Sequence, residues 1–433
     1  MSGTTHDDYS GSYAARARGM TASEVRALFS VASRPEVVSL AGGMPYTAAL
    51  PLDAVAAMLG DLVSTRGAAA LQYTAGQGDP RLREHICSVM AVEGISAAPD
   101  DVVVTVGSQH GLDLVSRVFL DPGDVVVAEG PSYVGALGVF AAAEAEVVHV
   151  PMDRDGLQPE RLASTLERLA AAGRRVKLLY TVPAFHNPAG VTLADDRRQA
   201  VLDLAGRHGV LVLEDNPYGL LDFDSPPPAP LRARRAAGVI YLGTFSKTFA
   251  PGFRVGWVLA PPAIRDKLVL ANEAAVLCPP TFSQLAVVGY LETQPWQEQI
   301  KAFRELYRER RDAMLDALDD LLPPGPVWNK PAGGFYVWLT LPPGLDAKAM
   351  LPRAIAERVA YVPGTAFYAD GNGSSALRLS YCYPPPERIR EGIRRLANVM
   401  EVELDLLHTF GPAGTPDRPH GSIRADAPGP DLT

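Results

Sequence analysis

The segment with the clearest chemical potential lies in the middle of the chain, where Lys247 stands near Ser246 and Arg254. It directly follows an apolar run that predicts a buried strand, and open α/β sheets bind ligands at strand ends. A lysine among apolar residues loses hydration, which lowers its pKa and frees the amine to attack a carbonyl carbon. Ser246 and Arg254 are suited to hold a phosphate beside it. Taken alone, Lys247 is more often an ordinary surface lysine, so the rest of the chain must decide.

A carboxylate stands at the end of another predicted strand. Asp215 closes the apolar run 210–213 and is followed closely by Tyr218. A buried carboxylate is costly without a cationic partner, and a pyridinium nitrogen is the kind of partner that would keep it ionised. Asp215 could equally cap a helix, since aspartate is a preferred N-cap residue.

Three further segments after predicted strands carry polar or aromatic side chains. The amide of Asn187 could donate to a phenolate oxygen, although Asn-Pro also forms turns. Ser108 and Gln109 open a predicted helix, and a helix N-terminus is suited to bind an anion. Tyr133 could stack on a flat ring, although most such aromatic residues pack in a core. Few functions need a phosphate cradle, a stacking ring, an amide, a carboxylate, a lysine and an arginine together.

The elements that must position these residues are short β-branched runs that alternate with amphipathic helical stretches. This alternation predicts an α/β fold with a mostly parallel seven-stranded sheet covered by helices. The seventh strand follows the sixth too closely for a crossover helix, which indicates antiparallel pairing. The predicted strands span residues 102–106, 125–128, 147–150, 176–182, 210–214, 239–242 and 254–259.

A second, smaller α+β unit is predicted toward the C-terminus. A helical pattern spans about 295–322, and strand patterns at 333–341, 360–363 and 376–380 alternate with two helices. The first 20 residues and the C-terminal tail lack periodicity, and the tail is rich in glycine and proline. The predicted organisation is a flexible arm at 1–20, a segment at 21–95 that packs with the small domain, a large ligand-binding domain at 96–325, a small domain at 326–408 and a disordered tail at 409–433.

The composition argues against several classes of function. A net charge of -9, from 49 acidic and 40 basic residues, disfavours binding to nucleic acid. Cys87, Cys278 and Cys382 are too far apart to indicate a disulfide framework or a metal site, which fits a reducing cytoplasm. The chain has no apolar stretch of about 18 residues and no signal-like start, so neither a membrane partner nor export is expected.

The order and the amino-acid sequences of these motifs resemble those of the class I/II aminotransferases of pyridoxal-phosphate fold type I, over about residues 23–400. Segments 39–45 and 243–256 are most similar to the branch that contains 2-aminoadipate and kynurenine aminotransferases. The resemblance implies that Lys247 carries pyridoxal 5′-phosphate as an internal aldimine and moves a proton between the substrate Cα and the cofactor. It also implies that Asp215 keeps the ring nitrogen protonated, while Asn187 and Tyr218 hydrogen-bond the ring oxygen.

The resemblance assigns the remaining cofactor contacts as well. Ser108, Gln109, Ser246 and Arg254 would bind the phosphate, and Tyr133 would stack on the ring. Tyr73 would reach the phosphate of a neighbouring subunit. A homodimer follows from that last role, with the 21–95 segment also meeting the partner.

Substrate-binding residues are implied in the same way. Arg378 matches the arginine that grips the α-carboxylate, a task suited to a planar guanidinium, although without the resemblance it would pass for a surface arginine. Gly42, Gly43 and Asn187 would lie beside that carboxylate, where a missing side chain lets the backbone approach. Arg26, on the first helix, matches a mobile arginine that meets acidic side chains in some relatives.

Two positions depart from the pattern of these relatives. Cys278 and Pro280 stand where the relatives usually have histidine and serine, near the substrate entrance, so side-chain recognition is expected to differ. Cys278 could also be a plain buried apolar residue.

The predicted function is transfer of an amino group between an amino acid and a 2-oxo acid, with glutamate and 2-oxoglutarate as one pair. The same site could support decarboxylation, racemisation, or β- or γ-replacement, because the fold does not choose among these reactions. Some proteins of this fold are effector domains of transcription regulators. That alternative is not expected here, because only about 20 residues precede the first predicted helix.

Overall fold

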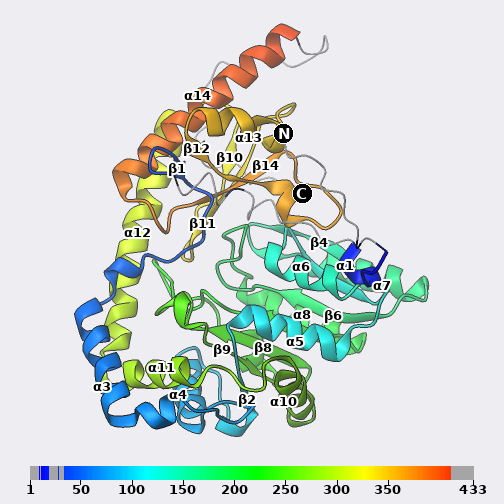
Figure 1. The fold of residues 1–433 in the computed structure, drawn as a ribbon. Helices are drawn as coiled ribbons and strands as arrows, with labels where there is room; N and C mark the ends of the chain where they lie inside the picture. The colour runs from blue at the N-terminus through cyan, green and yellow to red at the C-terminus, as the bar shows by residue number, and fades with distance from the viewer. Residues whose placement is uncertain (1–8, 10, 19–27, 29–33, 411–433) are drawn as a thin grey trace.

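The computed structural model describes residues 9, 11–18, 28 and 34–410. Its centre is a mixed sheet with the strand order β2-β9-β8-β7-β6-β3-β4-β5 (Figure 1). Neighbours from β8 to β4 pair in parallel, whereas β9 runs antiparallel between β8 and β2. The α/β class, the parallel pairing and the antiparallel strand are therefore confirmed, and the two-residue β5 adds an eighth strand to the predicted seven.

The bounds of these strands follow the β-branched runs closely. They are β2 (Val102–Thr105), β3 (Val125–Gly130), β4 (Glu146–Asp153), β5 (Gly156–Leu157), β6 (Val176–Thr181), β7 (Leu211–Asp215), β8 (Val239–Thr244) and β9 (Gly256–Leu259).

Alternation along each strand buries the two faces of the sheet against different helices. Val103 of β2 belongs to an apolar cluster with α5, α6 and α10, whereas Val102 and Val104 belong to the cluster that contains α4 and α11. Val127 of β3 packs in a third cluster with α7 and α8. Because both faces are covered, the strands are continuously apolar rather than alternating with polar residues.

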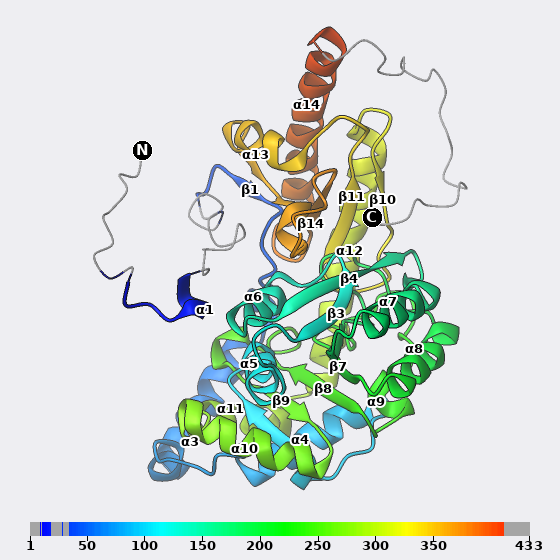
Figure 2. The ribbon, with the colours of Figure 1, turned by 90° about the vertical axis from the view of Figure 1, so that its right-hand side faces the viewer.

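The smaller part of the molecule is a four-stranded antiparallel sheet with the order β10-β11-β14-β13 (Figure 2). A separate parallel pair joins β1 to β12, with Val38 opposite Val359. β1 and β10 were not predicted, since two residues are too few to show a periodicity. The bounds are β1 (Val38–Ser39), β10 (Val327–Trp328), β11 (Tyr336–Thr340), β12 (Val359–Ala360), β13 (Val362–Pro363) and β14 (Ala376–Ser380).

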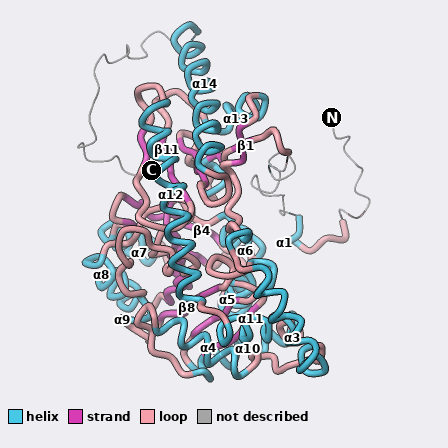
Figure 3. Tube along the Cα trace, turned by 90° about the vertical axis from the view of Figure 1, so that its left-hand side faces the viewer, coloured by secondary structure: helices cyan, strands magenta, loops and turns pink. Residues whose placement is uncertain are grey.

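Long helices connect the two parts. α12 packs against α14 beside the small sheet and extends along the side of the molecule toward the large sheet (Figures 1 and 3). The segment before residue 96 contacts both parts, because β1 pairs with β12 while α3 packs on α11 and α4 packs on β2. The helix bounds are α1 (Ala15–Arg18), α3 (Leu52–Ala70), α4 (Pro80–Ala91), α5 (Ser108–Phe119), α6 (Val134–Ala142), α7 (Pro159–Ala171), α8 (Asp195–Arg207), α9 (Leu231–Arg234), α10 (Pro262–Val276), α11 (Thr281–Thr293), α12 (Trp296–Leu321), α13 (Ala347–Ala356) and α14 (Pro386–Phe410).

Some sequence predictions fall outside this description. The helix expected just after residue 20 and the tail from residue 411 lie largely or wholly outside the described residues. The predicted domain boundaries stay predictions. Within the described part of the chain, no helix combines the length and the apolar character needed to cross a membrane.

Candidate active site

The large sheet brings the carboxyl ends of its parallel strands to one edge. β2 and β8 both pair antiparallel with β9, so they run in the same direction as β7, β6 and β3. Thr105 of β2 and Thr244 of β8 both lie opposite Gly256. The segments that follow these strands therefore start at the same edge, where such sheets bind ligands. Asp215 is the last residue of β7, and the segments that follow the strands carry Ser108, Gln109, Tyr133, Asn187, Tyr218, Ser246, Lys247 and Arg254.

Lys247 lies in the turn after β8 and is half-buried. Its Nζ donates a hydrogen bond to the Gly43 carbonyl at 2.9 Å and lies 5.6 Å from the centroid of the Phe335 ring. Burial lowers the pKa of its ammonium to about 8, and the positive charges of Arg378 and Arg254 act in the same direction. The surface-lysine alternative does not describe this side chain, which is half-buried and hydrogen-bonded to the backbone of a distant segment.

Asp215 ends β7 and is only 3% exposed. Its Oδ2 accepts a hydrogen bond from the Tyr180 hydroxyl at 3.0 Å. Its Oδ1 is buried and has no hydrogen-bond partner among the described residues. Burial raises the pKa of the carboxyl to about 7, against the opposing effects of Tyr180 and Lys247. A buried carboxylate oxygen without a donor is costly, so this atom fits a cationic N–H group on a ligand.

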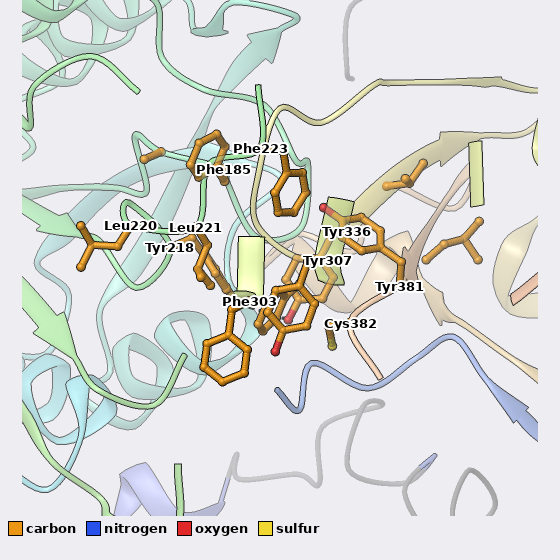
Figure 4. Packing of buried hydrophobic residues seen from close by; sticks show 14 of the residues in the cluster. Phe185, Tyr218, Leu220, Leu221, Phe223, Phe303, Tyr307, Tyr336, Tyr381 and Cys382 are labelled. Carbon is orange, nitrogen blue, oxygen red and sulfur yellow. Dashed lines mark hydrogen bonds between the residues drawn. The ribbon is translucent and has the colours of Figure 1, made fainter. Parts of the chain in front are cut away.

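Tyr218 is fully buried between the two parts of the molecule, and Figure 4 shows it among the aromatic residues of the central core. Its hydroxyl lies 3.3 Å from the Tyr336 hydroxyl, and its ring meets the Phe335 and Tyr336 rings edge to face. Burial raises its pKa well above the ordinary tyrosine value, so the hydroxyl keeps its proton. Tyr218 is therefore able to donate a hydrogen bond to an oxygen placed beside it.

Arg378 and Asn187 join the two sheets through a side-chain hydrogen bond. Arg378 lies in β14 and is 3% exposed, and its Nη1 donates to Asn187 Oδ1 at 2.8 Å. Its Nη2 donates to the Ala41 carbonyl at 2.7 Å, while its buried Nε has no partner among the described residues. The guanidinium carbon lies 4.2 Å from the Tyr336 ring centroid and 5.0 Å from that of Phe367. The guanidinium is thus held in a fixed plane with N–H groups to spare, which suits a carboxylate.

Arg254 closes a compact cradle at the start of α5. Its Nη1 donates to Ser246 Oγ at 3.4 Å, and its Nη2 donates to the Val106 carbonyl at 3.2 Å. Gly107, which precedes the first residue of α5, has a φ of +77°, and a Cβ at this position would collide with the Arg254 guanidinium. A guanidinium, a hydroxyl and the N-terminus of a 12-residue helix therefore meet at one point, which is suited to a phosphate.

Tyr133 directly precedes α6 and contacts the first turn of α5. Its hydroxyl donates to Gln109 Oε1 at 3.2 Å, and Gln109 Nε2 donates to the Gly135 carbonyl at 2.8 Å. Burial raises the pKa of Tyr133 to about 12, and the negative charge of Asp215 acts in the same direction. Gln109 therefore connects the start of α5 to the Tyr133 side chain.

The other predicted site residues are not all gathered here. Gly43 lies against the Tyr336 hydroxyl so closely that a Cβ would collide with it, and Gly42 is its neighbour. Tyr73 is 76% exposed, in the segment between α3 and α4. Arg26 lies outside the described residues.

The two departures from the relatives' pattern, Cys278 and Pro280, lie in the turn between α10 and α11. Cys278 is half-buried and not fully enclosed in a core. Their predicted effect on side-chain recognition stays a prediction.

Sequence reasoning missed several residues that the fold brings to this edge. Tyr336 and Tyr180 contact Tyr218 and Asp215, but in the sequence both look like core residues of apolar strands. The buried Glu129 lies 3.1 Å from His186, and it also accepts hydrogen bonds from the Val182 N–H and the Thr181 hydroxyl. The position of His186 directly before Asn187 was an available signal.

Comparisons with known proteins agree with this geometry. The sequence matches the aminotransferase class I and II family over residues 35–396. It is 42% identical to aromatic-amino-acid aminotransferase 1 of Thermococcus litoralis over 92% of this chain and 96% of that protein. It is 37% identical to the 2-aminoadipate transaminase of Thermus thermophilus over 89% of this chain and 96% of that protein.

A solved structure supports the same assignment. The kynurenine aminotransferase of Pyrococcus horikoshii, in complex with PMP, superposes with a TM-score of 0.88 at 41% identity, covering 92% of this chain and 98% of that one. The resemblance to fold type I and to the branch with 2-aminoadipate and kynurenine aminotransferases is thereby confirmed. The chain belongs to the aminotransferase class I and II family and is an aminotransferase.

Proposed function

We propose that this enzyme uses pyridoxal 5′-phosphate, held covalently by Lys247, to move an amino group between an amino acid and a 2-oxo acid. Glutamate and 2-oxoglutarate form one of the two substrate pairs. The observation that carries the proposal is Oδ1 of Asp215, which has no partner in the described part of the chain and lies on the same sheet edge as the Lys247 amine and the Arg254 cradle. A pyridinium ring with a phosphate and an aldehyde has one group for each of these three positions.

Different residues would bind the different groups of the cofactor. Arg254, Ser246, Ser108 and the α5 N-terminus would hold the phosphate, assisted by Gln109. Asp215 would keep the ring nitrogen protonated, Tyr133 would stack on the ring, and Asn187 and Tyr218 would donate to the ring oxygen. When bound, the ring supplies an electron sink for the electrons released at the substrate Cα.

Lys247 acts as the proton carrier in this arrangement. Once the substrate amine has replaced it, its Nζ is a free base able to take a proton from Cα and return it elsewhere. A pKa of about 8 places this amine close to the pH at which a general base works best. Its hydrogen bond to the Gly43 carbonyl keeps it beside the substrate loop.

Arg378 would orient the substrate by its α-carboxylate. Its two existing hydrogen bonds and its stacking on Tyr336 and Phe367 fix the plane in which that carboxylate docks. Gly42, Gly43 and Asn187 would line the same place, and Arg26 would meet acidic substrate side chains. The relatives act on aromatic amino acids, 2-aminoadipate and kynurenine, so these are the first donors to test.

We also propose that the enzyme is a homodimer in which Tyr73 reaches the partner's phosphate. Tyr73 is 76% exposed and Leu71 beside it is 75% exposed, which is unfavourable for apolar side chains left in water. Light scattering should give the mass of two chains, and a monomer that retains full activity would contradict this proposal. A cytoplasmic location, predicted from the sequence, stays a prediction.

The test is a donor screen with 2-oxoglutarate, read out by mass spectrometry. A substrate amino acid should yield glutamate and its own 2-oxo acid in equal amounts. Lys247→Ala should abolish both products, whereas the exposed Lys301→Ala, matched as a lysine removed elsewhere, should not change them. Release of carbon dioxide or of a side-chain fragment without glutamate would refute transamination and favour the other reactions of this cofactor.

A further inference from the structure

Tyr336 begins β11 of the small sheet, yet its hydroxyl reaches a residue of the large part. It lies 3.3 Å from the Tyr218 hydroxyl, across the boundary between the two sheets. Figure 4 shows the two tyrosines with Tyr307, Tyr381 and Cys382 in the same core. In the function proposed above only the Tyr336 ring has a role, as the surface against which Arg378 stacks, and the hydroxyl has none.

In the structure Tyr218 donates to the Tyr336 hydroxyl. We infer that Tyr336 is a positioning residue for Tyr218: with the cofactor bound this hydrogen bond reverses, so that Tyr336 donates to the Tyr218 oxygen and the Tyr218 proton is directed toward the cofactor's ring oxygen. This inference rests on the proposed function, because it assumes that Tyr218 faces that oxygen. The direction of this hydrogen bond should change the pH dependence of the visible absorbance of the bound cofactor.

The single proton on each of the two hydroxyl groups supports this direction of donation. A tyrosine hydroxyl has one proton to donate and can accept through its oxygen, so only one of two adjacent hydroxyls can donate to the other. When Tyr218 gives its proton to a third oxygen, the bond with Tyr336 survives only if Tyr336 becomes the donor. Hydrogen bonds arranged in series polarise one another, so the donation from Tyr218 becomes stronger.

The surroundings of Tyr336 hold its hydroxyl in place for this task. The side chain is 2% exposed, and the Arg378 guanidinium carbon lies 4.2 Å from its ring centroid. Its ring meets the Tyr218 ring at 89°, with centroids 6.0 Å apart. Gly43 leaves no space beside the hydroxyl, since a Cβ there would overlap it. A rotation of Tyr336 away from Tyr218 would therefore break its stacking with Arg378.

The predicted consequence is spectroscopic. A hydrogen bond donated to the ring oxygen stabilises that oxygen as an anion. It therefore favours loss of the proton from the neighbouring nitrogen, the one that joins Lys247 to the cofactor. Removing the Tyr336 hydroxyl weakens that donation and should raise the pH at which the visible band changes, by roughly 0.2 to 0.6 unit.

The experiment is an absorbance titration of the cofactor-loaded protein between pH 5 and 10. Tyr336→Phe keeps the ring over Arg378, so the midpoint should rise while the KM for the amino acid stays unchanged. Tyr218→Phe should raise the midpoint further, and the double variant should match Tyr218→Phe, because Tyr336 acts only through Tyr218. Tyr361→Phe is the matched control, since its buried hydroxyl donates to the Ala347 carbonyl in the small part.

The outcomes separate this inference from the proposed function. If the wild-type protein shows no visible band that depends on Lys247, the proposed function fails. If the band is present and titrates identically in wild type and Tyr336→Phe, the positioning role of Tyr336 alone is overturned. Equal shifts from Tyr336→Phe in the presence and absence of the Tyr218 hydroxyl would also overturn it, because they would show a route that bypasses Tyr218.

Discussion

The Arg378→Lys substitution offers the sharpest test of how the substrate is held. Lysine keeps the positive charge but replaces a planar group of five N–H donors by a single ammonium with three. In the present structure Nη1 and Nη2 are each committed, to Asn187 at 2.8 Å and to the Ala41 carbonyl at 2.7 Å. An ammonium cannot keep both contacts and also present two parallel hydrogen bonds to a carboxylate.

The expected loss is that of about one charge-assisted hydrogen bond. Such a bond contributes about 1.5–3 kcal/mol, which corresponds to a decrease of roughly 10- to 150-fold in kcat/KM for the amino acid. The cofactor should remain bound, because the hydrogen bonds of Arg378 go to Asn187 and the Ala41 carbonyl and not to the Arg254 cradle or Asp215. The contact of the guanidinium with the Tyr336 ring, whose centroid lies 4.2 Å from the guanidinium carbon, also changes, which places the expected value toward the upper end.

The assay compares an amino acid with the amine that lacks its α-carboxylate, in single turnovers monitored by absorbance. Arg378→Lys should slow the reaction of the amino acid and leave the slow reaction of the amine unchanged. Arg198→Lys is the matched control, since Arg198 is a buried arginine whose hydrogen bonds all go to backbone carbonyls elsewhere. An equal loss for both donors would refute the carboxylate role of Arg378.

Three other substitutions test separate parts of the site. Asp215→Asn leaves a buried cation on the cofactor without its partner, which costs about 3–5 kcal/mol. The value of kcat/KM should therefore fall by roughly 150- to 5000-fold, and cofactor should be lost faster on dialysis. Gly43→Ala places a Cβ against the Tyr336 hydroxyl, and overpacking of about 1–3 kcal/mol should lower both Tm and kcat/KM. Burial raises the pKa of Glu93 to about 7, so its contribution to stability is present below the unfolded pKa near 4.5 and is lost as the pH rises through 7. Glu93→Gln should therefore raise Tm at pH 8 and not at pH 4, and an equal Tm change at both values would contradict this assignment.

The large sheet was predictable because most of its strands are buried on both faces, although β4 is only partly buried. Valine-rich runs such as 102–106 and 125–128 need no partner information to be identified, and ligand residues at strand ends follow from the sheet alone. Lys247, Asp215 and Asn187 could be named on that basis. Their contacts could not, because whether Oδ1 of Asp215 finds a partner among the described residues depends on which side chains surround it in three dimensions.

The small sheet's contribution was much harder to infer from the residues. Arg378 sits in a run of apolar residues, and its burial depends on pairing with Trp338 in β11 and Val362 in β13. Its partner Asn187 is 191 positions away in the sequence. Tyr336 has the same difficulty, since an aromatic residue in an apolar strand is normally core. Only the family resemblance pointed to Arg378, and nothing pointed to Tyr336.

The position of Arg378 is set by contacts between the two parts rather than by its own sheet alone. Phe367, which lies against its guanidinium, accepts at its carbonyl the N–H of Ser132, just after β3. Two residues further, the Ala369 N–H donates to His149 Nε2 at 2.9 Å. Because Nε2 accepts, Nδ1 carries the proton and donates to the Glu129 carbonyl at 2.8 Å. Burial lowers the pKa of His149, and its protonation would put a second N–H opposite that of Ala369 and weaken this contact between the two parts of the molecule.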